Sequence, residues 1–387
     1  MSSTPLENVP NPAGQPYGGN PEEPGAISSE WDQLTSGVSA APVPTVSSGL
    51  PKPPPPPEKW LPPAMPMDDG YTVYSSHLIT IADLIKSKVS GLEKAIGDLR
   101  SAWNSGALRD PSGGGLVNPA IMGEGPAVYW STGRDFGVMM NMIPKGFISA
   151  ATQIADIHVD AVRKLIDTAT VYGESENRNY KVVKGADGEG FGGLGGNARE
   201  PGAPPVLRQV VIKPGSLAPT DTTTINWQDI MSVLHHLEPG PCREAGGLLL
   251  ALGGELNQVA QQVADGGDQL ALHWQGQAAE AALKTFEKMH GQAAALAAEA
   301  IQAGNVLSWV GNDVFPVFKA IPSPGVASGL TEDIREAFGA WNLSGNVDYA
   351  GYFKAQQVAQ QYLTALDNYL VQAHHAIPSP IARTPGS

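Results

Sequence analysis

Cysteine is almost absent from the sequence, since Cys242 is the single cysteine among 387 residues. One cysteine excludes an intramolecular disulfide and a zinc site built from thiolates, and it leaves the redox compartment open. Cys242 stands at the start of an apolar segment, so we interpret it as a buried filler residue rather than a reactive thiol.

Basic residues are also scarce, because 24 Lys and Arg stand against 38 Asp and Glu and the formal net charge is −14. No Lys/Arg cluster could collect phosphate groups, so the sequence argues against a nucleic-acid partner and an anionic membrane surface. Other contact with a membrane or a lipid stays open. A run of about 18 apolar residues, long enough to span a bilayer, is missing. Residues 1–7 lack the basic and apolar regions of a secretory signal peptide, so we expect any export to use another route.

Patterns that carry catalysis or metal binding are missing as well. The eight His are dispersed, and the adjacent pairs His235-His236 and His374-His375 point to different helix faces. A zinc site on a helix uses His residues four apart instead. The Gly-x-Gly-x-x-Gly at residues 188–193 does not open a periodic helix, so we interpret it as a flexible loop rather than a dinucleotide site. The sequence predicts no enzyme, no cofactor and no metal site.

Proline and glycine are plentiful, with 34 and 45 residues concentrated in two stretches. Residues 1–70 hold few apolar groups to bury, so we expect a disordered arm with polyproline II structure near residues 51–57. Residues 177–225 are predicted to be a Gly-rich flexible linker. Within that linker, residues 180–183 and 206–212 are β-prone and could pair as a small ribbon.

Apolar residues recur at threes and fours in two pairs of long segments, which is the spacing of amphipathic helices. The first pair begins near Ser75, with Pro144 expected to kink or interrupt the start of its second helix and Gly173 expected to stop it. The second pair turns at residues 272–279. We therefore predict two αα-hairpins that bury their one-sided apolar faces against each other. The fold class is all-α, a four-helix bundle.

Further helices are predicted around these hairpins. A short helix near residues 230–234 can be capped by Thr224 or Asn226, and two more helices are expected over residues 330–341 and 347–373. The predicted organisation is a set of five segments: 1–70 arm, 71–176 hairpin, 177–225 linker, 226–320 hairpin, and 321–387 C-terminal helices with a short tail.

Two short motifs stand at the ends of the hairpins. Trp274-Gln275-Gly276 forms the turn of the second hairpin, and Tyr172-x-x-x-Glu176 follows the last helix of the first. Both patterns are short enough to arise by chance, and Trp309-Val310-Gly311 repeats the first outside any predicted turn. Their placement on hairpin ends carries more weight than the patterns themselves.

The combination resembles the substrates of actinobacterial type VII (ESX) secretion systems. The Trp-x-Gly hairpin is similar to WXG100 and PPE proteins, and the Tyr-x-x-x-Glu hairpin is similar to their PE partners. Both in one chain resemble the self-paired, EspB-like PE–PPE fusions. The resemblance covers residues 75–375 and makes segment 71–176 PE-like and segment 226–320 PPE/WXG-like.

This resemblance implies a secreted, non-enzymatic protein that forms ring-like homo-oligomers. It also implies that Trp274, Gly276, Tyr172 and Glu176 form a composite export signal, read at one end of the bundle by the secretion ATPase. Two other functions stay open. One is a cytosolic scaffold or chaperone that binds small WXG-type partners through the helix over residues 347–373, and the other is the targeting part of a toxin-like effector. The aromatic residues could also be no more than core caps of the bundle.

Overall fold

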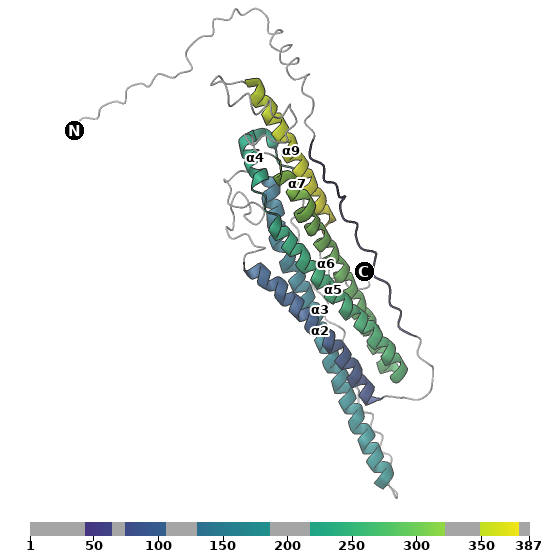
Figure 1. The fold of residues 1–387 in the computed structure, drawn as a ribbon. Coiled ribbons are helices and arrows are strands. Elements are labelled where there is room, and N and C mark those ends of the chain that lie inside the picture. Colours follow the sequence, from purple (N-terminus) through teal and green to yellow (C-terminus); the bar gives the residue numbers. More distant parts are fainter. Residues whose placement is uncertain (1–42, 64–73, 106–129, 186–216, 322–348, 379–387) are drawn as a thin grey trace, which may run out of the picture.

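The computed structural model describes residues 43–63, 74–105, 130–185, 217–321 and 349–378, with side chains omitted at 175–185 and 349–354. Within these ranges the chain forms helices and no strand, which confirms the all-α prediction. The long helices lie along one another in an elongated molecule (Figure 1). No helix in these ranges is long and apolar enough to cross a membrane.

The first hairpin consists of α2 (Ser75–Asn104) and α3 (Ser131–Gly185). α3 continues through Pro144 and Gly173, so the predicted interruption and the predicted stop are both wrong. A proline inside a helix costs about 3 kcal/mol, but the neighbouring Ile143 and Phe147 are fully buried and hold the backbone in place. Because α3 includes residues 180–183, the predicted β-ribbon is also wrong.

The second hairpin consists of α5 (Pro239–His273) and α6 (Gln277–Trp309), continued by the π-helical turn η2 (Val310–Val314) and α7 (Phe315–Lys319). The two long helices approach closely where a glycine of α5 faces a glycine of α6. A Cβ on Gly304 would lie 2.9 Å from the Gly246 carbonyl oxygen, so neither backbone leaves room for a side chain there.

Three further helical elements pack at the end of the second hairpin that lies away from its turn: α4 (Trp227–His235), α9 (Tyr349–Ala376) and η1 (Thr222–Thr224). α4 begins after Asn226, whose side-chain oxygen accepts a 2.8 Å hydrogen bond from the Asp229 backbone N–H, which confirms the predicted cap. α4 packs against α9, with the short η1 beside them. The helix predicted over residues 330–341 lies outside the described ranges.

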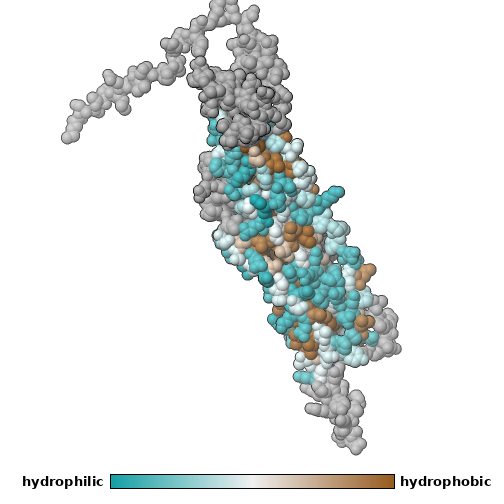
Figure 2. All heavy atoms as spheres, viewed as in Figure 1, coloured by the Kyte–Doolittle hydropathy of each residue, from teal (hydrophilic) through white to brown (hydrophobic). Residues whose placement is uncertain are grey.

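The two hairpins meet mainly through α2 and α5. α2 buries one stripe of side chains, spaced by threes and fours, that includes Leu78, Ile85, Leu92 and Leu99, each at most 1 % exposed. Fully burying such a side chain contributes about 1.5–3 kcal/mol, so this shared face stabilises both hairpins. On the face in view, polar residues cover most of the surface and apolar patches are small and separate (Figure 2).

The structure describes residues 43–63 of the Pro-rich arm, and these residues do not confirm the predicted disorder. We call them the strap. The strap has neither helix nor strand and runs alongside α6 (Figure 1). Its Val46, Leu50 and Trp60 are partly buried against the core. The strap has few apolar side chains, and it packs these three against the folded helices.

Cys242 has no exposed surface, and this confirms its interpretation as a filler residue. Burial raises the pKa of its thiol to about 12, with Arg243 opposing the shift. A thiol with such a pKa carries almost no thiolate at neutral pH and is a poor nucleophile.

Candidate interaction site at the α5–α6 turn

Backbone geometry explains the Trp-x-Gly motif at the turn between α5 and α6. Trp274 ends α5, and its backbone N–H donates a 2.9 Å hydrogen bond to the Leu270 carbonyl. Gly276 precedes α6 with φ 105° and ψ 177°, a conformation that residues with a Cβ rarely adopt. The turn therefore needs glycine at this position.

The same turn contacts the other predicted motif. The ring of Trp274, which is 3 % exposed, lies edge-to-face against Tyr172 of α3, with ring centroids 6.4 Å apart and an interplanar angle of 73°. Such pairs contribute about 0.5–1.5 kcal/mol beyond the area they bury. Three of the four predicted signal residues, Tyr172, Trp274 and Gly276, are thus brought to one place.

Glu176 lies one helical turn beyond Tyr172 on α3, and residues four apart share a helix face. Its side chain is outside the described part of the chain. The competing motif at residues 309–311 falls within continuous helix from α6 into η2 and makes no turn. The hairpin context separates the two Trp-x-Gly matches, as the sequence predicted.

The start of α2 completes this end of the molecule. The backbone N–H of Tyr74 donates to the His273 carbonyl at 3.4 Å, and the rings of His77 and His273 stack with centroids 3.8 Å apart. Tyr74 packs edge-on against both imidazoles. We call these residues, together with Tyr172 and Trp274, the tip.

Sequence reasoning missed the histidines of the tip. The signal for Tyr74 and His77 was weak, because two polar aromatic residues at a helix start usually face solvent. Only tertiary structure brings them to His273. Desolvation lowers the pKa of His273, and the positive charge that His77 can carry lowers it further. Both causes disfavour the protonated form of His273 in this stacked pair.

Exposed apolar and aromatic side chains lie at the tip and next to it. Leu272 is 67 % exposed, Val171 54 % and Tyr74 53 %. They offer a partner apolar and aromatic contacts, the kind of groups that dominate protein interfaces. Among the described residues no group of three or more His, Cys, Asp or Glu could hold a metal ion. The exposed apolar and aromatic side chains make the tip suited to binding a partner.

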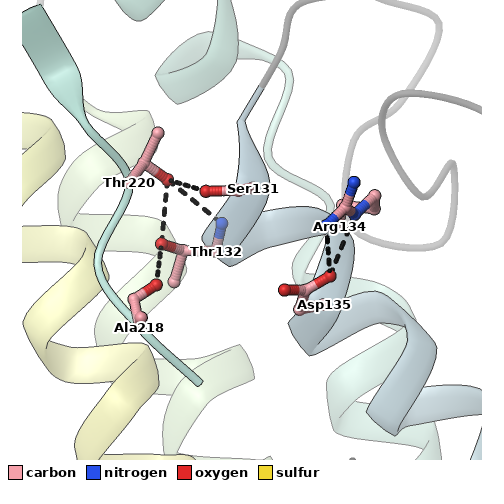
Figure 3. Close-up of polar contacts among 6 residues, drawn as sticks. All are labelled: Ser131, Thr132, Arg134, Asp135, Ala218 and Thr220. Carbon is pink, nitrogen blue, oxygen red and sulfur yellow. Dashed lines mark hydrogen bonds and ion pairs between the residues drawn. The ribbon is translucent and has the colours of Figure 1, made fainter. Parts of the chain in front are cut away.

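A polar cluster fixes the N-terminal end of α3. The carboxylate of Asp367 on α9 accepts hydrogen bonds from the Trp130 indole at 2.7 Å, the Thr132 hydroxyl at 2.7 Å and the Thr220 backbone N–H at 2.6 Å. Thr220 also accepts bonds from the Ser131 hydroxyl and the Thr132 backbone, as Figure 3 shows. We call Trp130, Thr132, Thr220 and Asp367 the Asp367 node.

The node has a structural role. Asp367 has no exposed surface, and burial raises its pKa, although the bonds from Trp130, Thr220 and Thr132 act in the opposite direction. A carboxylate closed off from solvent cannot reach a substrate, but it can join three separate chain segments. Sequence reasoning missed this node. The available signal was an acidic residue among the buried Leu363, Leu366 and Leu370.

No known protein-family model matches the chain, and no curated protein shows significant similarity to it. Its function is therefore inferred from its motifs and geometry.

Proposed function

We propose that the chain is a secreted, non-enzymatic substrate of an actinobacterial type VII secretion system. In this proposal the chain pairs its own PE-like and PPE-like hairpins as a four-helix bundle. Trp274, Gly276, Tyr172 and Glu176 form a composite export signal at the tip, and the secretion ATPase is the partner that reads it.

The observation that carries this proposal is the contact between Tyr172 and Trp274. The two motifs belong to different hairpins, yet their aromatic rings are in direct contact in the folded chain. The packing of α2 on α5 supports self-pairing, because each hairpin covers the apolar face of the other. In separate PE-like and PPE-like chains, a second polypeptide would have to supply that face.

Export is tested by expressing Tyr172→Ala and Trp274→Ala in a bacterium with a working type VII system and comparing culture medium with cells. We expect both variants to remain in the cells. Trp274 is buried, so its removal also leaves a cavity that costs about 3–5 kcal/mol. A control must therefore lose as much packing at a different place.

Trp309→Ala provides that control. Trp309 is 4 % exposed and belongs to the competing Trp-x-Gly, but it lies far along α6 from the turn. We expect Trp309→Ala to be exported whenever its far-UV helicity matches that of Trp274→Ala. Export of Trp274→Ala at the wild-type level contradicts the proposal, and so does equal retention of both Trp variants.

The scaffold hypothesis required free apolar surface on the C-terminal helix. Over residues 355–377 the apolar stripe of this region is buried against the rest of the chain, with Val358, Leu363, Leu366 and Leu370 at most 2 % exposed. This packing favours the secreted substrate over the scaffold. The toxin-like effector remains an alternative that activity assays of the purified protein would test.

Self-association into homo-oligomers is part of the proposal. A groove of about 640 Å³ runs between α2 and α3, and Val159 and Ile166 on its border are 39 % and 38 % exposed. Light scattering of the purified protein tests the proposal, with Val159→Asp and Ile166→Asp expected to reduce the oligomer mass. A monomer at all concentrations contradicts it.

A further inference from the structure

The strap lies on a surface whose side chains contact its main chain at intervals. The Trp309 indole N–H donates to the Ser48 carbonyl at 3.2 Å, and the Gln302 side-chain amide donates to the Pro51 carbonyl at 3.5 Å. His290 Nε2 lies 3.4 Å from the Glu58 carbonyl oxygen. All three side chains belong to α6, so a single helix contacts the backbone carbonyls of the extended strap.

These contacts fall in reverse order along α6, so the strap runs antiparallel to it. From residue 290 to residue 309, α6 rises about 28 Å at 1.5 Å per residue. The strap covers the same distance between residues 48 and 58, which is about 31 Å at the polyproline II rise of 3.1 Å per residue. A segment in an extended, polyproline II-like conformation matches this length, and Pro51 with the prolines at 53–57 favours that conformation before binding.

The strap also has an anchor. The Trp60 indole lies over Gly267 of α5, where any Cβ would collide with the ring. Its N–H donates to the Asp268 carboxylate at 3.3 Å, and its ring lies 6.0 Å from the His290 ring. Gly267 and Asp268 thus form a socket shaped for an indole.

The far end of the strap reaches α9. The Val46 backbone N–H donates to the Tyr369 hydroxyl at 3.2 Å, and Tyr369 packs edge-on against Trp309. Gln302 is only 6 % exposed, its amide also reaches the Ala376 carbonyl at 3.4 Å, and its side-chain oxygen is buried without a hydrogen-bond partner. A buried amide with spare hydrogen-bonding capacity suits a surface that recognises peptide groups.

The contacts that hold the strap are individually weak. The strap's polar contacts with the helices are 3.2–3.5 Å long, at or beyond the upper end of the usual range for a hydrogen bond. The other ring nitrogen of His290 lies closer, 3.0 Å from the Ala260 carbonyl oxygen, and a neutral imidazole donates to only one of the two carbonyls. None of the ion pairs found among the described residues involves the strap. Release of the strap would therefore break no ion pair and no short hydrogen bond among these contacts, and its main cost would be the packing of Val46, Leu50 and Trp60.

We propose that the face of α5, α6 and α9 under the strap is a binding groove for an extended, proline-containing peptide with a tryptophan anchor. The strap is its built-in ligand. The strap of a second copy is its ligand in trans, because that segment has the same length match and the same indole. The proposal is independent of the export signal, since the groove shares no residue with the tip.

Binding is tested with a fluorescent synthetic peptide of residues 43–63 added to the full chain. We expect it to bind the Trp60→Ala chain, whose own strap has lost its anchor, and to bind wild-type chain at least ten-fold more weakly, because the intact strap competes at high effective concentration. A peptide carrying Trp60→Ala is expected to bind the Trp60→Ala chain at least ten-fold more weakly.

Gly267→Leu in the Trp60→Ala chain fills the socket and is expected to abolish binding. Gly247→Leu is the matched control, because a Cβ at this exposed position of the same helix meets no neighbouring atom. Far-UV helicity checks that both variants fold. Absence of binding to the Trp60→Ala chain overturns the groove, and so does equal binding to the Gly267→Leu and Gly247→Leu chains.

Exchange between copies is tested by cross-linking. A chain with Pro51→Cys is mixed with a chain with Gln302→Cys, after denaturation and refolding together, and the mixture is oxidised. The native Cys242 is buried and gives no background. We expect a covalent dimer that joins the two variants and increases with protein concentration. If no such dimer forms at any concentration, while the double variant closes within one chain, the second copy is excluded as a ligand.

Discussion

The two ends at which α3 meets the rest of the molecule are held by different physics. At the tip, aromatic rings of Tyr172 and Trp274 touch beside exposed apolar side chains. At the Asp367 node, a fully buried carboxylate on α9 accepts three short hydrogen bonds from two other chain segments. A buried polar network is costly to break, whereas the partly buried Tyr172 ring and the exposed apolar side chains beside it can be changed at smaller cost and are accessible to a partner. The node is therefore expected to serve stability alone, and recognition is expected at the tip.

A large loss of stability is expected from Asp367→Ala. This change leaves the Trp130 indole and the Thr220 backbone N–H buried without an acceptor, and each such donor costs about 1–3 kcal/mol. We expect the free energy of unfolding to fall by about 3–5 kcal/mol in urea denaturation. Asp367→Asn keeps one acceptor oxygen and is expected to lose less. An unchanged denaturation midpoint for Asp367→Ala would show that the node does not hold α3.

A slightly smaller effect is expected from pH, acting on α3 between its two ends. His158 is fully buried, and burial lowers its pKa to about 4, against the opposing hydrogen bond to the Ile154 carbonyl. The unfolded chain therefore binds more protons than the folded chain between about pH 6.5 and pH 4. Stability from this group is complete above pH 6.5 and is lost as pH falls, by about 3 kcal/mol at pH 4.

The measurement is urea denaturation from pH 7 to pH 4, with His158→Gln as the comparison. We expect the variant to lose stability less steeply than the wild type over this range. Asp367 acts with the opposite sign, because its raised pKa means that folding binds a proton and its contribution declines as pH rises above the unfolded pKa. Parallel slopes for wild type and His158→Gln would show that His158 is not the group that titrates.

A moderate effect is expected from Gly276→Ala at the tip. The φ of 105° is strained for alanine and costs about 1–3 kcal/mol. Gly247→Ala on the exposed face of α5 is the control, and it should stabilise the helix by about 0.5–1 kcal/mol. Thermal unfolding followed by circular dichroism distinguishes the two. If both variants behave alike, the turn does not depend on its glycine.

The smallest loss of stability is expected from Tyr172→Leu, which keeps an apolar side chain and removes the ring contact worth about 0.5–1.5 kcal/mol. Export is nevertheless expected to fail, because the aromatic half of the proposed signal is gone. Secretion and unfolding are measured on the same variant. If Asp367→Asn stops export while Tyr172→Leu is exported normally, the assignment of stability to the node and of recognition to the tip is wrong.

Much of the helical framework follows from local sequence. The spacing of Leu78, Ile85 and Leu92 predicts α2, Asn226 predicts the start of α4, and the apolar segments on both sides of Trp274 predict α5 and α6. These predictions succeed because periodicity and capping act within a few turns of one helix. The expectation for Pro144 fails because the burial of Ile143 and Phe147 outweighs local propensity. The expectation for Gly173 fails although Val171 beside it is 54 % exposed, and burial does not explain why α3 continues there.

The amino-acid sequence by itself determined that the chain is helical, that it folds into long hairpins, and that a glycine turn follows Trp274. Tertiary structure alone decided that Tyr172 touches Trp274, that Asp367 is buried under Trp130, and that the strap lies along α6. The reason is physical. Helix periodicity repeats every few residues and can be read locally, whereas these contacts join residues more than a hundred positions apart and depend on how the finished helices pack.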